Sequence, residues 1–207
     1  MYQKLLSLGL CCALMACSKR DPVRELPNQI PDFEQTSCAD AQYPEWSTSL
    51  YVLPYPVGKS YNVGLSHCGG SFHSEGAPDQ FAVDFDMMIG SLITAARPGR
   101  VIYVEESGMD GNFPNNLVVV QHDDNTYAHY MHLTFEGAIV EVNDLVNQGD
   151  EIGYSGSTGL AGYPHLHFVV TVGGWTYPYV SMPYNFRNTE PNPKSLTSGV
   201  SYLAEPY

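Results

Sequence analysis

The chain has 207 residues, of which 43% are hydrophobic and 15% charged, and this is enough for one domain with a single core. Its 22 acidic residues outnumber 9 lysines and arginines, giving a formal net charge of -13. A balance this acidic excludes a nucleic-acid binder and electrostatic adhesion to anionic lipid, and it leaves the substrate open.

The first residues have the pattern of an export signal. Residues 1–16 carry an early cation, Lys4, and then the apolar run LLSLGLCCALMA, which is too short to span a bilayer as a helix. With Cys17 directly after Ala16, the segment resembles a bacterial lipoprotein signal, in which this cysteine becomes the lipidated first residue. The alternative is an ordinary secretory signal cleaved near Ala16. Ser18 is not the aspartate that retains lipoproteins at the inner membrane, so we expect attachment at the periplasmic face of the outer membrane.

A polar, proline-containing segment follows the signal. Residues 17–45 show no sustained apolar period, which suits a tether between the membrane and the domain. After export and lipidation only Cys38 and Cys68 remain as thiols. In an oxidising periplasm these two most simply form a disulfide, which would contribute about 3 to 4 kcal/mol. Metal binding by the pair is the alternative, but no CxxC spacing supports it.

The body of the chain reads as strands separated by turn residues. Short runs rich in Val, Ile, Tyr and Phe alternate with Gly, Pro, Asn and Asp clusters, and helical periods are missing. We therefore predict an all-β fold of antiparallel sheets, a sandwich or open barrel with a central groove, over residues 46–187, followed by a tail, 188–207, packed on the domain or trailing from it. HDDNT between two strands predicts a hairpin. The predicted strands are 50–55, 80–85, 92–96, 100–106, 116–122, 126–133, 138–142, 151–156, 165–172 and 175–180.

Two histidines in the segment GYPHLHF are the most informative residues. In an extended strand side chains alternate, so His165 and His167 share one face while Leu166 and Phe168 enter the opposite layer. The following FVVTV is rich in β-branched residues and supports the strand. Two imidazoles on a rigid strand make a good platform for a metal.

Other candidates are sorted by the same alternation. Asp84 in FAVDFD projects away from an aromatic core face, and a carboxylate in that position needs a partner. His73 lies in the preceding glycine-containing stretch and could fold back beside Asp84, with His67 as its competitor. In TYAHYMHL, His129 and His132 fall on opposite faces, and one of them should face the groove.

These segments together resemble the lysostaphin-type, or LytM-like, zinc metallopeptidases. The chain has FHSEGAPDQFAVDF, then YMHL, then GYSGSTGLAGYPHLHF, in the order in which that family carries its motifs. The resemblance implies that His73, Asp84 and His167 are zinc ligands and that His132 and His165 are the catalytic histidines. The gap between the first histidine and the aspartate is longer than in the commonest pattern of the family.

The residue types fit a catalytic zinc site without the resemblance. Such a site has three protein ligands, imidazole or carboxylate, and keeps a fourth position for water. One of the two remaining histidines would take a proton from that water or hold it in line. The other would stabilise the oxyanion or protonate the leaving amine, and the sequence does not order the two roles.

We therefore predict a zinc-dependent metalloendopeptidase that hydrolyses peptide cross-links of bacterial peptidoglycan. It would carry one Zn²⁺, be anchored to the membrane through Cys17, bind no nucleic acid and act as a monomer. One alternative is a lipoprotein that binds wall peptide and activates a partner hydrolase without cleaving. A periplasmic zinc-holding protein is a weaker alternative, because it would need a fourth ligand that the sequence does not offer.

Overall fold

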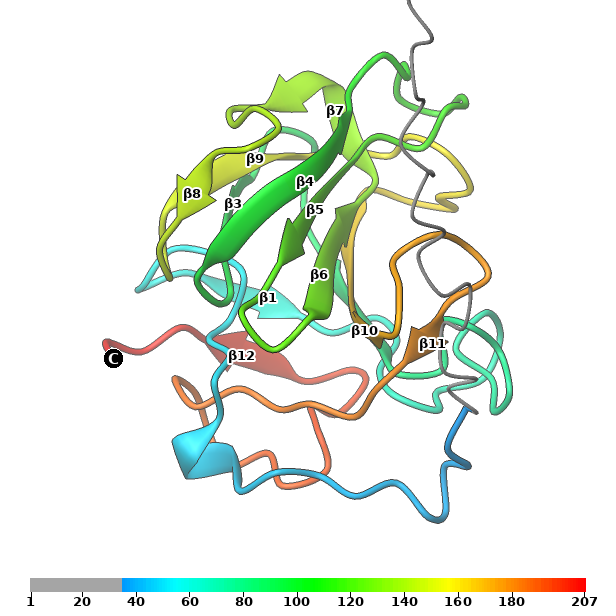
Figure 1. Ribbon diagram of the computed structural model, residues 1–207, viewed down its shortest axis with the longest axis vertical. Coiled ribbons are helices and arrows are strands. Elements are labelled where there is room, and N and C mark those ends of the chain that lie inside the picture. The colour runs from blue at the N-terminus through cyan, green and yellow to red at the C-terminus, as the bar shows by residue number, and fades with distance from the viewer. Residues whose placement is uncertain (1–34) are drawn as a thin grey trace, which may run out of the picture. The chain divides into compact units, whose positions relative to one another are not determined.

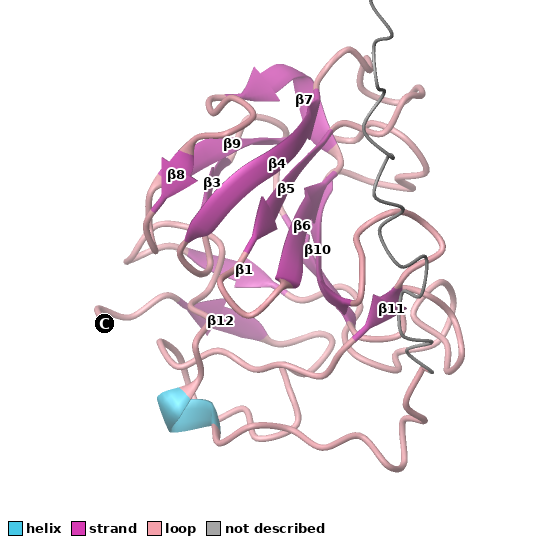
Figure 2. Ribbon diagram, in the orientation of Figure 1, coloured by secondary structure: helices cyan, strands magenta, loops and turns pink. Residues whose placement is uncertain are grey.

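The structure, a computed structural model, describes residues 35–207. The expected signal 1–16, the lipidated Cys17 and the first part of the tether lie outside the described residues. Figure 2 shows strands and loops throughout, with one short helical turn, η1, at Trp46–Thr48. The all-β prediction is therefore confirmed. In the described part of the chain, no helix is long and apolar enough to cross a membrane.

Antiparallel pairing joins the strands into three open sheets (Figure 1). The largest has seven strands in the order β11-β10-β6-β5-β4-β8, with β2 also paired to β10. A three-stranded sheet has the order β3-β9-β7, and β1 pairs with β12. The strands are β1 Ser60–Asn62, β2 Ala82–Asp86, β3 Leu92–Thr94, β4 Gly99–Glu105, β5 Leu117–Gln121, β6 Thr126–Met131, β7 Leu133–Ala138, β8 Leu145–Val146, β9 Glu151–Ser155, β10 His165–Val172, β11 Val180–Ser181 and β12 Ser201–Leu203.

Strand β10 pairs with three other strands of the large sheet. One of its edges pairs with β6, and its other edge pairs first with β2 and then with β11. Leu166, Phe168 and Val170 on one face enter the main core, where Phe168 packs against Tyr130 of β6. The opposite face carries His165 and His167, as strand alternation predicts.

The hairpin predicted at HDDNT joins β5 to β6. Asn125 has a φ of 59°, a left-handed conformation that asparagine tolerates. The Oδ1 atom of Asp124 accepts hydrogen bonds from both the amide and the hydroxyl of Thr126, at 3.1 and 2.6 Å. This local bonding closes the turn and sets the register of the two strands.

The structure departs most from three of the predicted strands. Residues 50–55 are buried but form no strand, because the amide of Leu53 bonds to the side chain of Asn188 instead of a neighbouring strand. Of residues 138–142 only Ala138 belongs to a strand, the end of β7, and the chain turns at Asn143, whose φ is 85°. Of 175–180, only the last residue joins β11.

The ends of the described chain pack onto the domain. Cys38 and Cys68 form the expected disulfide, and the side chain of Gln35 donates a hydrogen bond to the carbonyl of Ser181. At the other end, β12 of the C-terminal tail pairs with β1, and Tyr202 is buried in the main core.

Candidate metal centre

The pairing of β2 with β10 brings carboxylates opposite imidazoles. His165 lies opposite Asp86, and His167 lies opposite Asp84. Directly opposed residues of antiparallel strands point to the same face, so all four side chains emerge on the side away from the main core. The register of β2 and β10 alone therefore places these four side chains together, without any contribution from a loop.

His73, Asp84 and His167 form the first candidate metal cluster. All three are buried, and one ligand atom from each lies within 4.8 Å of the others. The Oδ1 atom of Asp84 stands 3.4 Å from Nε2 of His73 and 2.8 Å from Nδ1 of His167. Ligand atoms about 2.0–2.1 Å from a tetrahedral zinc lie roughly 3.3 Å apart, so these donors are spaced for one ion.

The loop before β2 delivers His73 in a defined orientation. Its Nδ1 donates a hydrogen bond to the carbonyl of Ser66 at 3.2 Å, which leaves Nε2 directed toward Asp84. The backbone amide of His73 donates to the carbonyl of Gly70 at 2.9 Å, closing a tight turn. This candidate ligand comes from a loop and is thus held by contacts with its own loop.

The competing histidine, His67, lies outside this cluster. Its Nδ1 contacts the hydroxyl of Tyr43 at 3.1 Å, and its Nε2 contacts Oγ of Ser195 at 3.3 Å. Its ring packs edge-on against Tyr184. Both ring nitrogens have partners away from Asp84, so His73, and not His67, is the histidine next to the carboxylate.

His132 and His165 form a second cluster with His167. The rings of His132 and His165 have centroids 4.7 Å apart. Their Nδ1 atoms donate to the carbonyls of Thr158 and Tyr163, both at 2.7 Å. This bonding fixes the proton on Nδ1, so the Nε2 lone pairs are free to accept a proton.

The orientation of His132 breaks the strand alternation on which the sequence argument rested. Strict alternation places His132 on the core face of β6, with Tyr130. The strand ends at Met131, however, and His132 adopts a left-handed φ of 65° while its amide bonds to Oδ1 of Asn115. This turn moves the ring to the face that carries His165. His129 remains in the sheet, where its Nε2 contacts a threonine hydroxyl.

Burial and neighbouring charges divide the histidines electrostatically. Burial, with the charges of nearby imidazoles, lowers the pKa of His132 to about 3, and burial also lowers the pKa of His165. Burial alone would lower the pKa of His167 too, but carboxylates on both its sides raise that pKa to about 10. The pKa of Asp84 falls well below its usual range because His167 and His73 outweigh burial. The neutral rings of His132 and His165 therefore lie beside the charged pair formed by Asp84 and His167.

One residue of the site escaped the sequence reasoning. Asp79 lies in the loop before β2, and its Oδ1 atom is 3.2 Å from Nε2 of His167. Nothing in its spacing distinguishes it from other loop carboxylates, because the contact arises only from tertiary structure.

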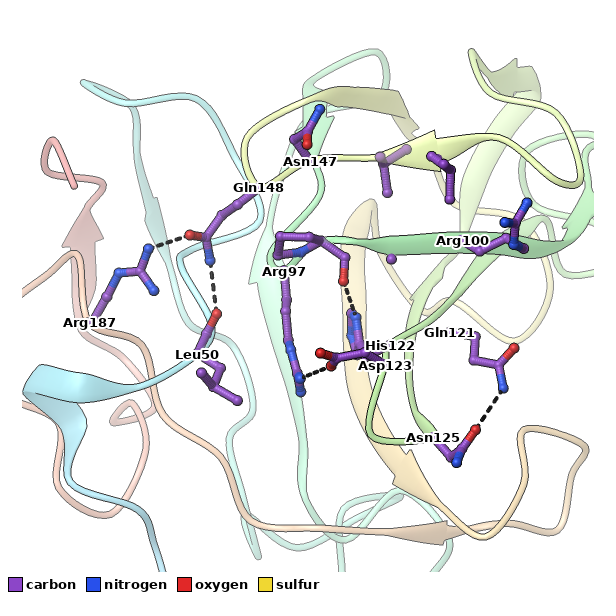
Figure 3. Close-up of a pocket in the computed structure, with 14 residues that line it drawn as sticks. Leu50, Arg97, Arg100, Gln121, His122, Asp123, Asn125, Asn147, Gln148 and Arg187 are labelled. Atoms are coloured by element: carbon purple, nitrogen blue, oxygen red, sulfur yellow. Dashed lines mark hydrogen bonds and ion pairs between the residues drawn. The ribbon is translucent and has the colours of Figure 1, made fainter.

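A separate pocket of about 830 Å³ lies at the β5–β6 hairpin, and none of the clustered histidines lines it (Figure 3). Arg97 in this pocket bonds to Asp123 and Asp124, each at 2.7 Å. His122 donates from Nδ1 to the carbonyl of Pro98 at 2.8 Å. The charges of Arg97, Asp123 and Asp124 thus pair with one another, and the pocket lies at the opposite end of β6 from His132. We therefore take the histidine clusters, and not this pocket, as the candidate functional site.

Comparison with known proteins assigns the chain to a family. The profile of Peptidase family M23 matches residues 79–178, a span that holds Asp84, His132, His165 and His167. The chain therefore contains a Peptidase M23 domain. The resemblance seen in the sequence is therefore confirmed. M23 peptidases are zinc metallopeptidases, and a set of two imidazoles and one carboxylate fits that metal.

Relatives of the chain include lysostaphin and a peptidoglycan endopeptidase. Lysostaphin of Staphylococcus staphylolyticus is 32% identical over 133 residues, which cover 64% of this chain and 24% of lysostaphin. The peptidoglycan DD-endopeptidase ShyA of Vibrio cholerae is 29% identical over 122 residues, covering 58% of this chain and 27% of ShyA. The chain thus spans about a quarter of the length of each of these two.

A solved structure supports the fold. The deep-sea M23 metalloprotease pseudoalterin aligns with a TM-score of 0.50 at 21% identity, over 69% of this chain and 80% of that one. At this identity the likeness establishes the shared M23 architecture.

Proposed function

We propose that this M23 protein is a zinc-dependent endopeptidase that hydrolyses peptide cross-links of bacterial peptidoglycan. The observation that carries the proposal is the complete donor set, in which His73, Asp84 and His167 converge beside two neutral histidines. His73 and Asp84 would hold the zinc together with Nδ1 of His167. The relatives named above, a DD-endopeptidase among them, support the substrate class.

The roles of the residues follow from their hydrogen bonds. Bound zinc would acidify a water and polarise the scissile carbonyl. His132 and His165 hold their protons on Nδ1 through backbone carbonyls, so each offers an Nε2 lone pair to the cluster. One of them receives the proton of the attacking water. The other positions the substrate oxygen or delivers a proton to the leaving amine.

Exchange of single histidines tests this assignment. We expect His167→Ala to lose both zinc and the release of soluble peptides from purified sacculi, because it removes a ligand. His165→Ala should still bind zinc, while its cleavage rate falls by about 10²–10⁴-fold, the usual contribution of an acid–base group. His122→Gln, at the far end of the sheet, is the matched control and should cleave like the wild type.

Mass spectrometry of the released peptides would name the bond that is cut. Zinc-dependent cleavage lost in both site variants would support the peptidase. Binding to sacculi without cleavage, unchanged by either substitution, would refute the enzyme and support a wall-binding activator of a partner hydrolase.

We further propose that the protein works from the periplasmic face of the outer membrane, held by lipid on Cys17. An envelope location agrees with the peptidoglycan endopeptidases among its relatives. The intact mass of the N-terminal peptide measures acylation directly. Cys17→Ala should move the protein from the membrane fraction to the soluble periplasmic fraction, and an unchanged membrane fraction would contradict the anchor.

A further inference from the structure

Asp79 stands behind the candidate zinc ligand His167, on the side away from Asp84. Its side chain is only 21% exposed. Its Oδ1 atom lies 3.2 Å from Nε2 of His167 and accepts a hydrogen bond from the hydroxyl of Tyr179 at 2.5 Å. An unpaired charge at that depth would be costly, so this largely buried carboxylate depends on the two donors that bond to its oxygen.

His167 is oriented differently from the other three histidines of the site. His73, His132 and His165 each donate from Nδ1 to a backbone carbonyl and present Nε2 to the cluster. His167 instead presents Nδ1 to Asp84, so its Nε2–H needs an acceptor on the far side. Asp79 is that acceptor, and it is a carboxylate where the other three rings have neutral carbonyls.

The hydrogen bond has a definite chemical consequence for a metal ligand. A neutral imidazole carries one proton and one lone pair, on opposite nitrogens. An acceptor at Nε2 keeps the proton there and directs the lone pair of Nδ1 toward the cluster. An anionic acceptor also makes the imidazole a stronger donor to the metal. With Asp84 and Asp79 together, the two carboxylates balance the charge of one divalent cation.

Tyr179 extends this support to the strand that follows. It lies next to β11, is 9% exposed, and its ring packs against His129 with centroids 4.9 Å apart. Its hydroxyl donates to the same Oδ1 atom of Asp79 that contacts His167, and this bond restrains the carboxylate in that orientation.

We propose that Asp79 is a positioning residue that fixes the proton and ring of His167 for zinc binding, and that Tyr179 holds Asp79 in place. The inference rests on the proposed zinc site. It adds a residue that acts on the metal only through His167, and so it can fail while the ligand set stands.

Zinc affinity of the full-length chain, measured by competition with a chromophoric chelator, tests the proposal. We expect Asp79→Ala to bind zinc about 10–100-fold more weakly, the usual effect of removing such a partner. Asp79→Asn keeps an oxygen acceptor and should fall between Asp79→Ala and the wild type, and Tyr179→Phe should lose a few-fold. Asp123→Asn removes a carboxylate that is 91% exposed and should leave zinc affinity unchanged.

A second readout separates positioning from a merely structural role. Urea unfolding of the metal-free proteins reports the contribution of Asp79 to stability in the absence of zinc. The visible absorption of the Co²⁺-loaded protein reports ligand geometry, and we expect it to shift in Asp79→Ala. Weaker zinc binding with nearly unchanged metal-free stability would support the proposal.

The remaining outcomes distinguish two failures. If Asp79→Ala binds zinc like the wild type while His167→Ala does not, the role of Asp79 is refuted and the zinc site stands. Destabilised metal-free protein with unaltered zinc affinity would also refute it. If the wild type binds no zinc, both the site and this inference fall.

Discussion

Replacing both disulfide cysteines, Cys38→Ser with Cys68→Ser, should destabilise the fold by an amount set by the length of the loop that the disulfide closes. The two residues are 30 apart in sequence. Closing a loop of that size removes unfolded-state entropy worth about 3.7 kcal/mol at 25 °C. The native contacts nearby should survive, because the side chain of Gln80 still donates to the carbonyl of Thr36 and the amide of Cys68 to that of Gln80, at 2.6 and 2.7 Å.

The assay is urea unfolding of metal-free protein, followed by circular dichroism. The double variant should lose about 3 to 4 kcal/mol, and its melting temperature should fall by roughly 7–15 °C. Reductant should bring the wild type down to the same stability and leave the variant unchanged. A loss below about 1 kcal/mol would refute the loop-entropy argument for this bridge.

The same variant also tests how the site is held. The disulfide lies at the start of the loop that carries His73, but this histidine has its own hydrogen bonds to Ser66 and Gly70. We therefore expect zinc affinity to change by less than about threefold at 25 °C, where the variant remains folded. A larger loss would mean that the disulfide, not the local turn, positions His73.

Three further predictions concern buried polar groups, and urea unfolding of metal-free protein checks each. Burial lowers the pKa of His122 to about 4, below its unfolded value near 6.5. The unfolded chain therefore binds a proton more readily, so the contribution of neutral His122 to the free energy of unfolding is complete above pH 6.5 and is lost as pH falls toward 4. His122→Gln should abolish about 3 kcal/mol of that acid destabilisation, and an unaltered pH profile would contradict a neutral buried histidine. Asn116, fully buried, bonds through its side chain to both backbone groups of Gly108, and Asn116→Ala should cost about 3 kcal/mol. Tyr130→Phe should cost about 1–3 kcal/mol by leaving the amide of Ala96 unpaired, with no loss expected if water replaces the hydroxyl.

Local patterns in the sequence predicted the parts of the site that belong to regular strands. Alternation along β10 placed His165 and His167 together, and alternation along β2 placed Asp84 away from the core. The hairpin at residues 122–126 was also predictable, since its Asp and Asn side chains close the turn themselves. Most strands of five or more residues with β-branched side chains were predicted for the same reason, but β7 was not, since the predictions covered only its first and last residues.

What the sequence missed depends on contacts distant along the chain. The short strands β1 and β12 pair although they lie near opposite ends of the domain's sequence, and neither has enough residues to show an alternating pattern. Residues 50–55 have the composition of a strand, but their amides bond to a side chain and a loop carbonyl. Asp79 gains its significance only when the loop before β2 folds over β10.

His165 and His167 show how identical residues on one face acquire different roles. Strand alternation gives both the same direction, and the difference comes from the partner of each ring. A carbonyl two residues away holds the Nδ1 proton of His165 and leaves Nε2 as the atom with a free lone pair. A carboxylate 88 residues away contacts Nε2 of His167 and leaves Nδ1 facing Asp84, where we propose that it binds the metal. Exchanging these partners would exchange the nitrogen that each ring turns toward the cluster, so the proposed division between ligand and acid–base histidine depends on the loops around the strand.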